Sequence, residues 1–260
     1  IYKALVGLHP SMGYPQQRGF NIIKWTVDSN QDVISMNPDI LNDIAVTNNY
    51  RDEFISDLTI DSNDDIWVFT YTRSGFWPGT GSTLKRLLKY TKSTGVTIEY
   101  AVFDTSLPIL NSQKWYHTNV ILHNNTFYLG NLGTVSNTTG GKILKIVMNG
   151  MNDYTIEAIG GGVGHEPSTV GATTTLANAK FKFCPSNAGG GGPQFVYNNK
   201  LYLVDTENKC IKTLSLDGTN IVEMIMDFST TLASEHASIG GWVKAIHLYD
   251  NIMVILSYMG

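Results

Sequence analysis

The stretch Phe195–Gly218 reads FVYNNKLYLVDTENKCIKTLSLDG and sets the pattern of the whole chain. An apolar run, Leu201–Val204, follows a polar turn at residues 198–200, and a second turn leads into the alternating run Cys210–Leu216. Asp217–Gly218 then forms a third turn. Apolar runs joined by short polar turns are typical of an antiparallel meander. The stretch therefore predicts consecutive β-hairpins.

The same pattern recurs along the chain with links of different length. One class of hairpin turns at Asp28–Asn30, Ser93–Gly95, Asn149–Gly150 and Asp217–Gly218. Asn-Gly and Asp-Gly pairs suit such turns because they tolerate positive φ angles. A lysine falls at a similar place in the first strand of each of these hairpins, as Lys24, Lys89, Lys145 and Lys212. A second class of hairpin precedes three of these units and also ends the chain, as in residues 58–69 and 119–129, so each unit holds four strands.

Four-stranded units that recur about every 50 to 70 residues predict a β-propeller. We expect an all-β fold with three complete and two partial blades of four antiparallel strands, in one domain or a segment of one. The blade repeats span about 1–36, 54–103, 115–159, 193–228 and 242–260, with a Gly-rich insertion over 160–193. Both chain ends resemble second strands, so a segment of a propeller with about six or seven blades and a smaller closed ring both stay open.

Composition excludes some partners and leaves the cysteines open. The chain of 260 residues has a formal net charge of −4 and only 18 basic residues, which form no cluster. A nucleic-acid-binding face is therefore not expected, since phosphate contacts need clustered Lys and Arg. No apolar run approaches the roughly 20 residues that span a membrane. Cys184 and Cys210 form either one bridge or two buried thiols.

One blade carries a family resemblance. Residues 156–226 combine a Gly-rich link, a small-residue segment that includes Leu176–Asn178, the strand Leu201–Thr206, and then Asn208, Ile211 and Gly218. This order resembles an NHL-repeat propeller blade, and residues 55–100 are similar to the broader group of NHL, SMP-30-like and sensor-type propellers. The insertion Phe183–Pro193 departs from that pattern. The resemblance implies a scaffold that mostly binds proteins, glycans or small ligands, with enzymes as a minority, and a fold does not settle function.

Two long links are candidate binding segments. Phe76 and Trp77 lie between turn-forming residues in the link 72–83, and aromatic side chains on a loop can stack on sugars or anchor a protein partner. The alternative is that Trp77 folds back onto its own blade. Loops as long as the insertion 160–193 usually have a function. As a hypothesis, the insertion reaches across one propeller face and shapes a binding surface.

The sequence offers no local metal or catalytic motif. The six histidines lack the close spacing of a zinc site, and no activated nucleophile is evident. His165, in a blade-entry segment, and Asp205, after an apolar run, are candidate binding residues, with ordinary hydrogen bonding and packing as the alternative. The acidic run Asp61–Asp65 lacks the Gly and terminal Glu of a calcium loop, so we expect a β-turn there. We predict no cofactor, and a structural or channel-bound divalent cation stays open.

Asn124 and Asn137 begin N-glycosylation sequons, which matter if a eukaryotic cell exports the chain. The sequence favours a non-enzymatic binding or structural module, extracellular or on a surface, that engages a protein or glycan through its inter-strand loops. Two alternatives stay open. One is a metal-dependent enzyme of the lyase or hydrolase type with its site at the central channel. The other is a self-assembling subunit of an extracellular filament or virion.

Overall fold

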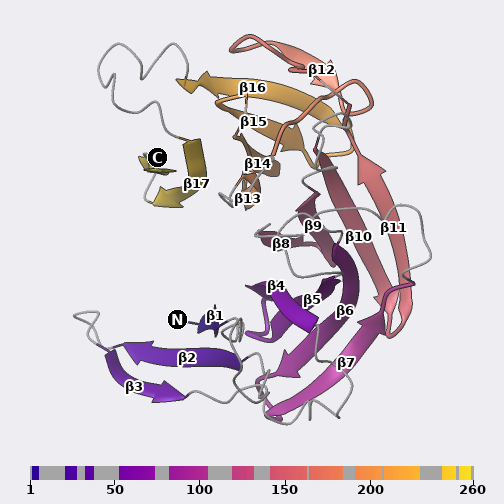
Figure 1. Cartoon of the computed structure of the whole chain (residues 1–260), viewed down its shortest axis with the longest axis vertical. Coiled ribbons are helices and arrows are strands. Elements are labelled where there is room, and N and C mark those ends of the chain that lie inside the picture. Colours follow the sequence, from indigo (N-terminus) through magenta and orange to yellow (C-terminus); the bar gives the residue numbers. More distant parts are fainter. Residues whose placement is uncertain are drawn as a thin grey trace, which may run out of the picture.

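Every described element of the chain is a β-strand in this computed structural model. The structure describes residues 2–5, 21–27, 33–37, 53–73, 82–104, 119–131, 141–162, 164–183, 191–206, 208–228, 242–249 and 252–258. Within these residues the strands form five antiparallel sheets. Figure 1 shows the sheets arranged as an open arc around a common centre, with both ends of the chain on its open side. The predicted all-β, propeller-like architecture is confirmed.

Three complete blades make up most of the arc. The first blade contains β4 (Glu53–Ile60), β5 (Ile66–Arg73), β6 (Ser82–Thr91) and β7 (Val96–Val102). The second contains β8 (Val120–His123), β9 (Thr126–Asn131), β10 (Lys142–Gly150) and β11 (Asp153–Ile159). The third contains β12 (Thr173–Thr175), β13 (Gly192–Tyr197), β14 (Lys200–Asp205), β15 (Cys210–Ser215) and β16 (Ile221–Asp227), in the order β12-β16-β15-β14-β13.

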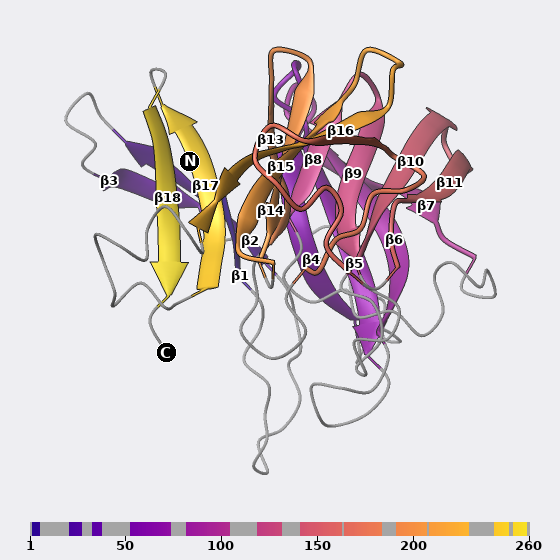
Figure 2. The same cartoon turned by 90° about the horizontal axis from the view of Figure 1, so that it is seen from above.

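Two smaller sheets flank the blades. One contains β1 (Tyr2–Leu5), β2 (Asn21–Val27) and β3 (Val33–Asn37), and the other contains β17 (Trp242–Tyr249) and β18 (Ile252–Tyr258). The innermost strands of the three complete blades are β4, β8 and β13, because β4 contacts β8, β8 contacts β13 and β13 contacts β17. Figure 2, turned by 90°, shows the sheets standing next to one another. Among the described residues, no helix is long and apolar enough to cross a membrane.

Local turn chemistry explains the hairpins. Asn124–Asn125 and Asn198–Asn199 each form a two-residue turn with positive φ at both positions, from 46° to 58°. Such turns match the twist of the strands that they join, and asparagine tolerates them. The predicted turn at Asn149–Gly150 is wrong by two residues. Strand β10 continues through Gly150, and the turn lies at Met151–Asn152, where Asn152 supplies the positive φ of 55°.

The described part of the Gly-rich insertion forms an extra strand and packs into the core. The hypothesis that the insertion reaches across one propeller face stays a prediction. Thr173–Thr175 form β12, which pairs with β16 and adds a fifth strand to the outer edge of the third blade. Phe181 and Phe183 are buried between the second and third blades. The reason is physical: large apolar side chains in this segment gain more from burial between blades than from exposure on a loop.

The core consists of the contacts between neighbouring blades. Trp67 and Phe69 of the first blade pack against Phe127 and Leu129 of the second. Tyr128 instead packs toward the third blade, with Phe181 and Leu203 among its neighbours. Successive residues of a strand point to opposite faces, so adjacent residues of β9 serve two different contacts. We call the contact between the first and second blades the first contact, and the contact between the second and third blades the second contact.

Candidate functional site

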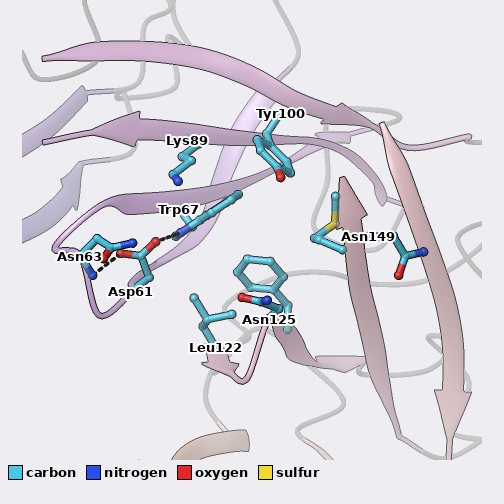
Figure 3. A pocket seen from close by; sticks show the side chains of 10 residues that line it. Asp61, Asn63, Trp67, Lys89, Tyr100, Leu122, Asn125 and Asn149 are labelled. Carbon is cyan, nitrogen blue, oxygen red and sulfur yellow. Dashed lines mark hydrogen bonds between the residues drawn. The ribbon is translucent and has the colours of Figure 1, made fainter. Parts of the chain in front are cut away.

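A pocket opens at one end of the first contact, between the first and second blades. We call it the Trp67 pocket, and its volume is about 260 Å³. The first blade contributes Asp61, Asn63, Trp67, Lys89 and Tyr100. The second contributes Leu122, Asn125, Phe127, Met148 and Asn149. Figure 3 shows these side chains around a shared space, with Asp61 and Trp67 on one side and Asn149 on the other.

Asp61 fixes the position of the Trp67 side chain. Its Oδ2 accepts a hydrogen bond of 2.9 Å from the indole Nε1 of Trp67. Its Oδ1 accepts hydrogen bonds from the backbone N–H groups of Asn63 and Asp65, at 2.8 and 3.0 Å. The predicted β-turn at Asp61–Asp65 is confirmed, since Asp64 N–H donates to the Asp61 carbonyl within it. The acidic turn therefore orders the wall of the pocket.

The aromatic side chains of the pocket meet edge to face. The ring centroids of Trp67 and Tyr100 lie 4.8 Å apart at an interplanar angle of 77°. Those of Trp67 and Phe127 lie 5.5 Å apart at 62°. Trp67 and Phe127 are buried, and Tyr100 is half-buried. Tyr100 is therefore the ring among the three that a ligand reaches most readily.

The charges near the pocket are paired within the protein. The Lys89 ammonium lies 2.9 Å from Asp65 Oδ2 and 4.7 Å from the centroid of the Trp67 ring. Burial acts to raise the pKa of Asp65, but the hydrogen bond and charge of Lys89 and the backbone N–H of Lys92 outweigh it and lower that pKa. Asp65 is therefore a stable counterion for Lys89.

A second pocket of about 260 Å³ occupies the corresponding place in the second contact. We call it the Tyr128 pocket. Lys145 pairs in register with Tyr128 in the second blade, as Lys89 pairs with Trp67 in the first. Its lining is more aliphatic, with Ile159, Leu176, Leu214 and Leu216. The two pockets therefore share a position in the repeat but differ in chemistry.

Lys212 does not correspond to the other two lysines. It pairs in register with Leu203, whereas the residue that matches Trp67 and Tyr128 is Tyr202, the partner of Thr213. A difference of one residue turns a side chain to the opposite face of its sheet. The sequence-based equivalence of the four lysines is therefore wrong for Lys212, and only the backbone of Lys24 lies in the described residues.

Asp205, a predicted binding residue, forms a fully buried ion pair with Lys212. Asp205 Oδ2 lies 2.9 Å from the Lys212 ammonium, and both side chains are 0% exposed. Lys212 also donates to the carbonyl oxygens of Glu166 and Lys180, at 3.2 and 2.8 Å. Asp205 Oδ1 accepts a hydrogen bond of 2.6 Å from Lys182 N–H. Together these bonds, which we call the Lys212 clamp, fasten residues 166–182 to the third blade.

His165, the other predicted residue, lies beside the clamp. Its Nε2 is 3.4 Å from Cys210 Sγ. Burial lowers the pKa of His165, the charge of Lys212 lowers it further, and Asp205, Asp227 and Glu166 oppose the shift. Burial, and then the charge of Asp205, raises the pKa of the Cys210 thiol well above its usual range. A buried thiol of this kind is not an activated nucleophile.

His165, Asp205 and Cys210 bring potential metal-ligand atoms within 4.8 Å of one another. However, the Asp205 carboxylate already accepts hydrogen bonds from Lys212, Lys182 and Asn208. The Lys212 ammonium supplies the positive charge that this carboxylate needs. The geometry therefore fits a structural clamp, and Cys210 is a free, buried thiol.

Several predicted positions lie outside the described residues: Phe76, Trp77, Asn137 and Cys184. Asn124 lies in the exposed turn between β8 and β9. Sequence reasoning missed the Trp67 pocket, whose lining comes from two blades. A usable signal was present, since Trp67 and Tyr128 follow the same turn pattern in successive repeats.

Comparisons with solved structures agree with the fold. The chain is similar to a luciferin-regenerating enzyme, with a TM-score of 0.50 and 11% identity over 92% of this chain and 63% of that one. A second match is an auxiliary nutrient binding protein from Bacteroides ovatus, with a TM-score of 0.34 and 13% identity. This match covers 81% of this chain and 52% of the nutrient binding protein. The chain thus spans less than two thirds of the length of both proteins.

Comparison with models of known protein families gives no match, and neither does comparison with curated proteins. The likeness to the luciferin-regenerating enzyme, at 11% identity, shows the fold alone. The resemblance to NHL repeats stays a prediction from the sequence. The chain has the fold of a β-propeller.

Proposed function

We propose that the chain is a non-enzymatic binding module that holds its ligand in the Trp67 pocket. The observation that carries this proposal is the lining of the pocket, in which a few polar side chains surround an aromatic and aliphatic floor. Concave sites of this composition are typical of small-ligand binding. Propellers bind through residues that neighbouring repeats present together, and this pocket is shared by two blades.

The other cluster of reactive side chains supports binding over catalysis. His165 and Cys210 hydrogen-bond to each other, Asp205 is engaged by Lys212, and Cys210 is fully buried. A catalytic group must reach the reacting atoms of a substrate. We assign these residues to the internal clamp. The low proportion of charged residues, 15%, supports the further proposal that the module works outside the cell or on a surface.

A ligand screen with a blocked pocket tests the proposed function. The panel contains methyl glycosides, nucleosides, amino acids and tripeptides, and the readout is the shift in melting temperature. Asn63→Trp places a large side chain at the mouth of the Trp67 pocket, because Asn63 is exposed there. Ser215→Trp is the matched control in the Tyr128 pocket.

We expect at least one compound to stabilise the native chain and the Ser215→Trp variant but not Asn63→Trp. The compound should be recovered unchanged after incubation, as a binding module requires. Equal stabilisation of all three proteins would place binding elsewhere and overturn the proposal. Chemical conversion of the compound would overturn the non-enzymatic part.

A further inference from the structure

We propose that the Trp67 pocket takes a neutral pyranose ring, the end of a glycan. This inference rests on the proposed function and names its ligand class. It follows from the charge, the hydrogen-bonding groups, the ring geometry and the size of the pocket.

The charged groups that line the pocket are already engaged within the chain. Asp61 uses both carboxylate oxygens within the chain, on two backbone N–H groups and the Trp67 indole. Lys89 is neutralised by Asp65 at 2.9 Å. An anionic ligand would lose its hydration without gaining a free counterion, and a cationic ligand would compete for the Asp61 oxygens that already accept hydrogen bonds, which is unfavourable in both cases. A neutral ligand meets neither cost.

The polar groups of the pocket require a ligand with both donors and acceptors. Within the described residues, no hydrogen-bond partner is found for the side-chain amides of Asn63 and Asn125. Each amide offers two N–H donors and one carbonyl acceptor. Asn149 makes only a long contact of 3.4 Å, from its Nδ2 to Asp153 Oδ1. Hydroxyl groups both donate and accept, so a polyhydroxylated ligand satisfies these amides.

The ring geometry favours a sugar over a flat aromatic base. Trp67 meets Tyr100 at 77° and Phe127 at 62°, so the three rings leave no parallel slot between two faces. A pyranose needs one apolar surface for its C–H face, and half-buried Tyr100 provides it next to Met148. Figure 3 shows Tyr100 on the opposite side of the space from Leu122 and Asn125. The pocket thus offers apolar surface and polar amides together, as the two chemical aspects of a sugar ring require.

The size of the pocket limits the ligand. Its volume of about 260 Å³ lies just below the range of about 300 to 1,000 Å³ that is typical for drug-sized ligands. One sugar ring fits this scale. A longer glycan would extend from the pocket into solvent.

Asn125→Gly tests the inference without straining the turn. Asn125 has a φ of 58°, a left-handed conformation that glycine adopts freely, so the substitution removes the amide and keeps the backbone. Asn199→Gly is the matched control, since Asn199 has a φ of 57° in the corresponding turn of the third blade and does not line the pocket. Binding is measured by calorimetry and by NMR with methyl α- and β-glycosides of glucose, galactose, mannose and N-acetylglucosamine.

We expect one or more glycosides to bind, and Asn125→Gly to weaken binding about three- to tenfold by loss of one net hydrogen bond. Asn199→Gly should leave the affinity unchanged. Equal affinity in both variants would place the sugar elsewhere and overturn the inference. If no glycoside binds, but a nucleoside or tripeptide binds and is weakened by Asn125→Gly, the sugar is excluded and the proposed function stands. If no probe is blocked by Asn63→Trp or weakened by Asn125→Gly, both fail.

Discussion

The first and second contacts between blades solve the same packing problem in different ways. In the first contact, aromatic side chains of two blades meet directly, with Trp67 edge-on to Phe127 at 5.5 Å. In the second, Phe181 and Phe183 from the segment before β13 stack on each other at 5.3 Å between the blades. A fully buried ion pair, Asp205 with Lys212, holds that segment in place. The first contact leaves an aromatic pocket with amides that have no partner among the described residues, whereas the second pairs Asp205 and Lys212 within the chain.

The two contacts differ in whether their polar side chains have partners within the chain, and this difference supports the proposal of binding at the first contact. Buried polar groups contribute to stability only when their hydrogen bonds are complete. In the second contact the polar atoms of Asp205 and Lys212 have partners within the chain. In the first contact Asn63 and Asn125 are exposed and lack such partners among the described residues. Unused donors and acceptors beside an apolar floor are free to recognise a ligand.

Lys212→Met is the strongest way to break the second contact. The substitution keeps the apolar stem and leaves Asp205 buried without its counterion. We expect the free energy of unfolding, measured in urea, to fall by about 3–5 kcal/mol, as for other broken buried pairs.

Lys145→Met is the matched control, because Lys145 is 38% exposed and lies 3.7 Å from an exposed Glu157. It should cost no more than about 1 kcal/mol, the range of surface pairs. The double variant Lys212→Met with Asp205→Leu should recover much of the loss, since it leaves no unpaired charge. Equal losses for Lys212→Met and Lys145→Met would show that the clamp is not structural.

The lysines also show what the sequence could predict and what it could not. Hairpins follow from local chemistry, and the two-residue turns at Asn124–Asn125 and Asn198–Asn199 need only residues that tolerate positive φ. The face on which a lysine lies depends on its pairing partner in another strand. The sequence places Lys212 and Lys145 at similar positions in their strands, but their strand pairing differs by one residue. Register is set by tertiary packing, which spacing alone does not reveal.

The candidate site shows the same limit. The sequence predicts His165 and Asp205 as binding residues in two separate segments, and the structure brings both to the clamp. The Trp67 pocket combines residues from turns and strands of two blades, so no short motif contains it. The acidic turn at Asp61 was recognised as a turn. Its bond to the Trp67 indole, six residues away, depends on the fold of the hairpin.

Asp57→Asn tests the first contact through its dependence on pH, since Asp57 joins the first and second blades. Its Oδ2 accepts a hydrogen bond of 2.8 Å from Val120 N–H. Burial raises the pKa of Asp57 from 3.8 to about 6, against the opposing effect of hydrogen bonds from the Val120 and Leu58 N–H groups. The folded state therefore binds the proton more tightly than the unfolded state. The contribution of Asp57 to stability is full below about pH 4 and is lost as the pH rises through about 6.

We expect Asp57→Asn to match the native stability near pH 4 and to exceed it by about 2–3 kcal/mol above pH 7, at about 1.4 kcal/mol for each pKa unit. Urea unfolding between about pH 4 and 8 measures the difference. Glu157→Gln, at a side chain that is 63% exposed, is the matched control for removing a carboxylate. A difference between Asp57→Asn and the native chain that does not change with pH would contradict the prediction.

Asp61→Ala tests how the first contact orders its pocket. The substitution removes the acceptor of the Trp67 indole and of two backbone N–H groups. We expect a loss of about 1–2 kcal/mol in unfolding free energy, in the range for a lost capping carboxylate. Ligand affinity in the Trp67 pocket should fall with it, because the indole is no longer held.

Asp217→Ala is the control for the turn alone. Asp217 accepts hydrogen bonds from the N–H and hydroxyl of Thr219 in an exposed turn and holds no aromatic side chain. It should cost less stability than Asp61→Ala and leave ligand affinity unchanged. If both variants behave alike, Asp61 acts only on its turn.

His165→Ala has the smallest expected effect and tests the edge of the second contact. At about pH 8 the variant should lose about 0.5–1.5 kcal/mol, the net value of one hydrogen bond, here with Cys210. The pKa of His165 is lowered by burial and by Lys212, so the unfolded state binds its proton more readily. The native chain therefore loses stability as the pH falls below about 6.5, and the gap to His165→Ala narrows.

Cys210→Ala separates the hydrogen bond from the titration. It removes the partner of His165 but keeps the imidazole in its buried place. The unfolding free energy of this variant should therefore still fall at acid pH, as that of the native chain does. The two variants should therefore diverge as the pH falls, although each loses the same contact. Parallel curves of unfolding free energy against pH for the two variants would mean that His165 has the same pKa in the folded and unfolded chain. His165 would then contribute nothing to the pH dependence of the second contact, which would rest on the Lys212 clamp.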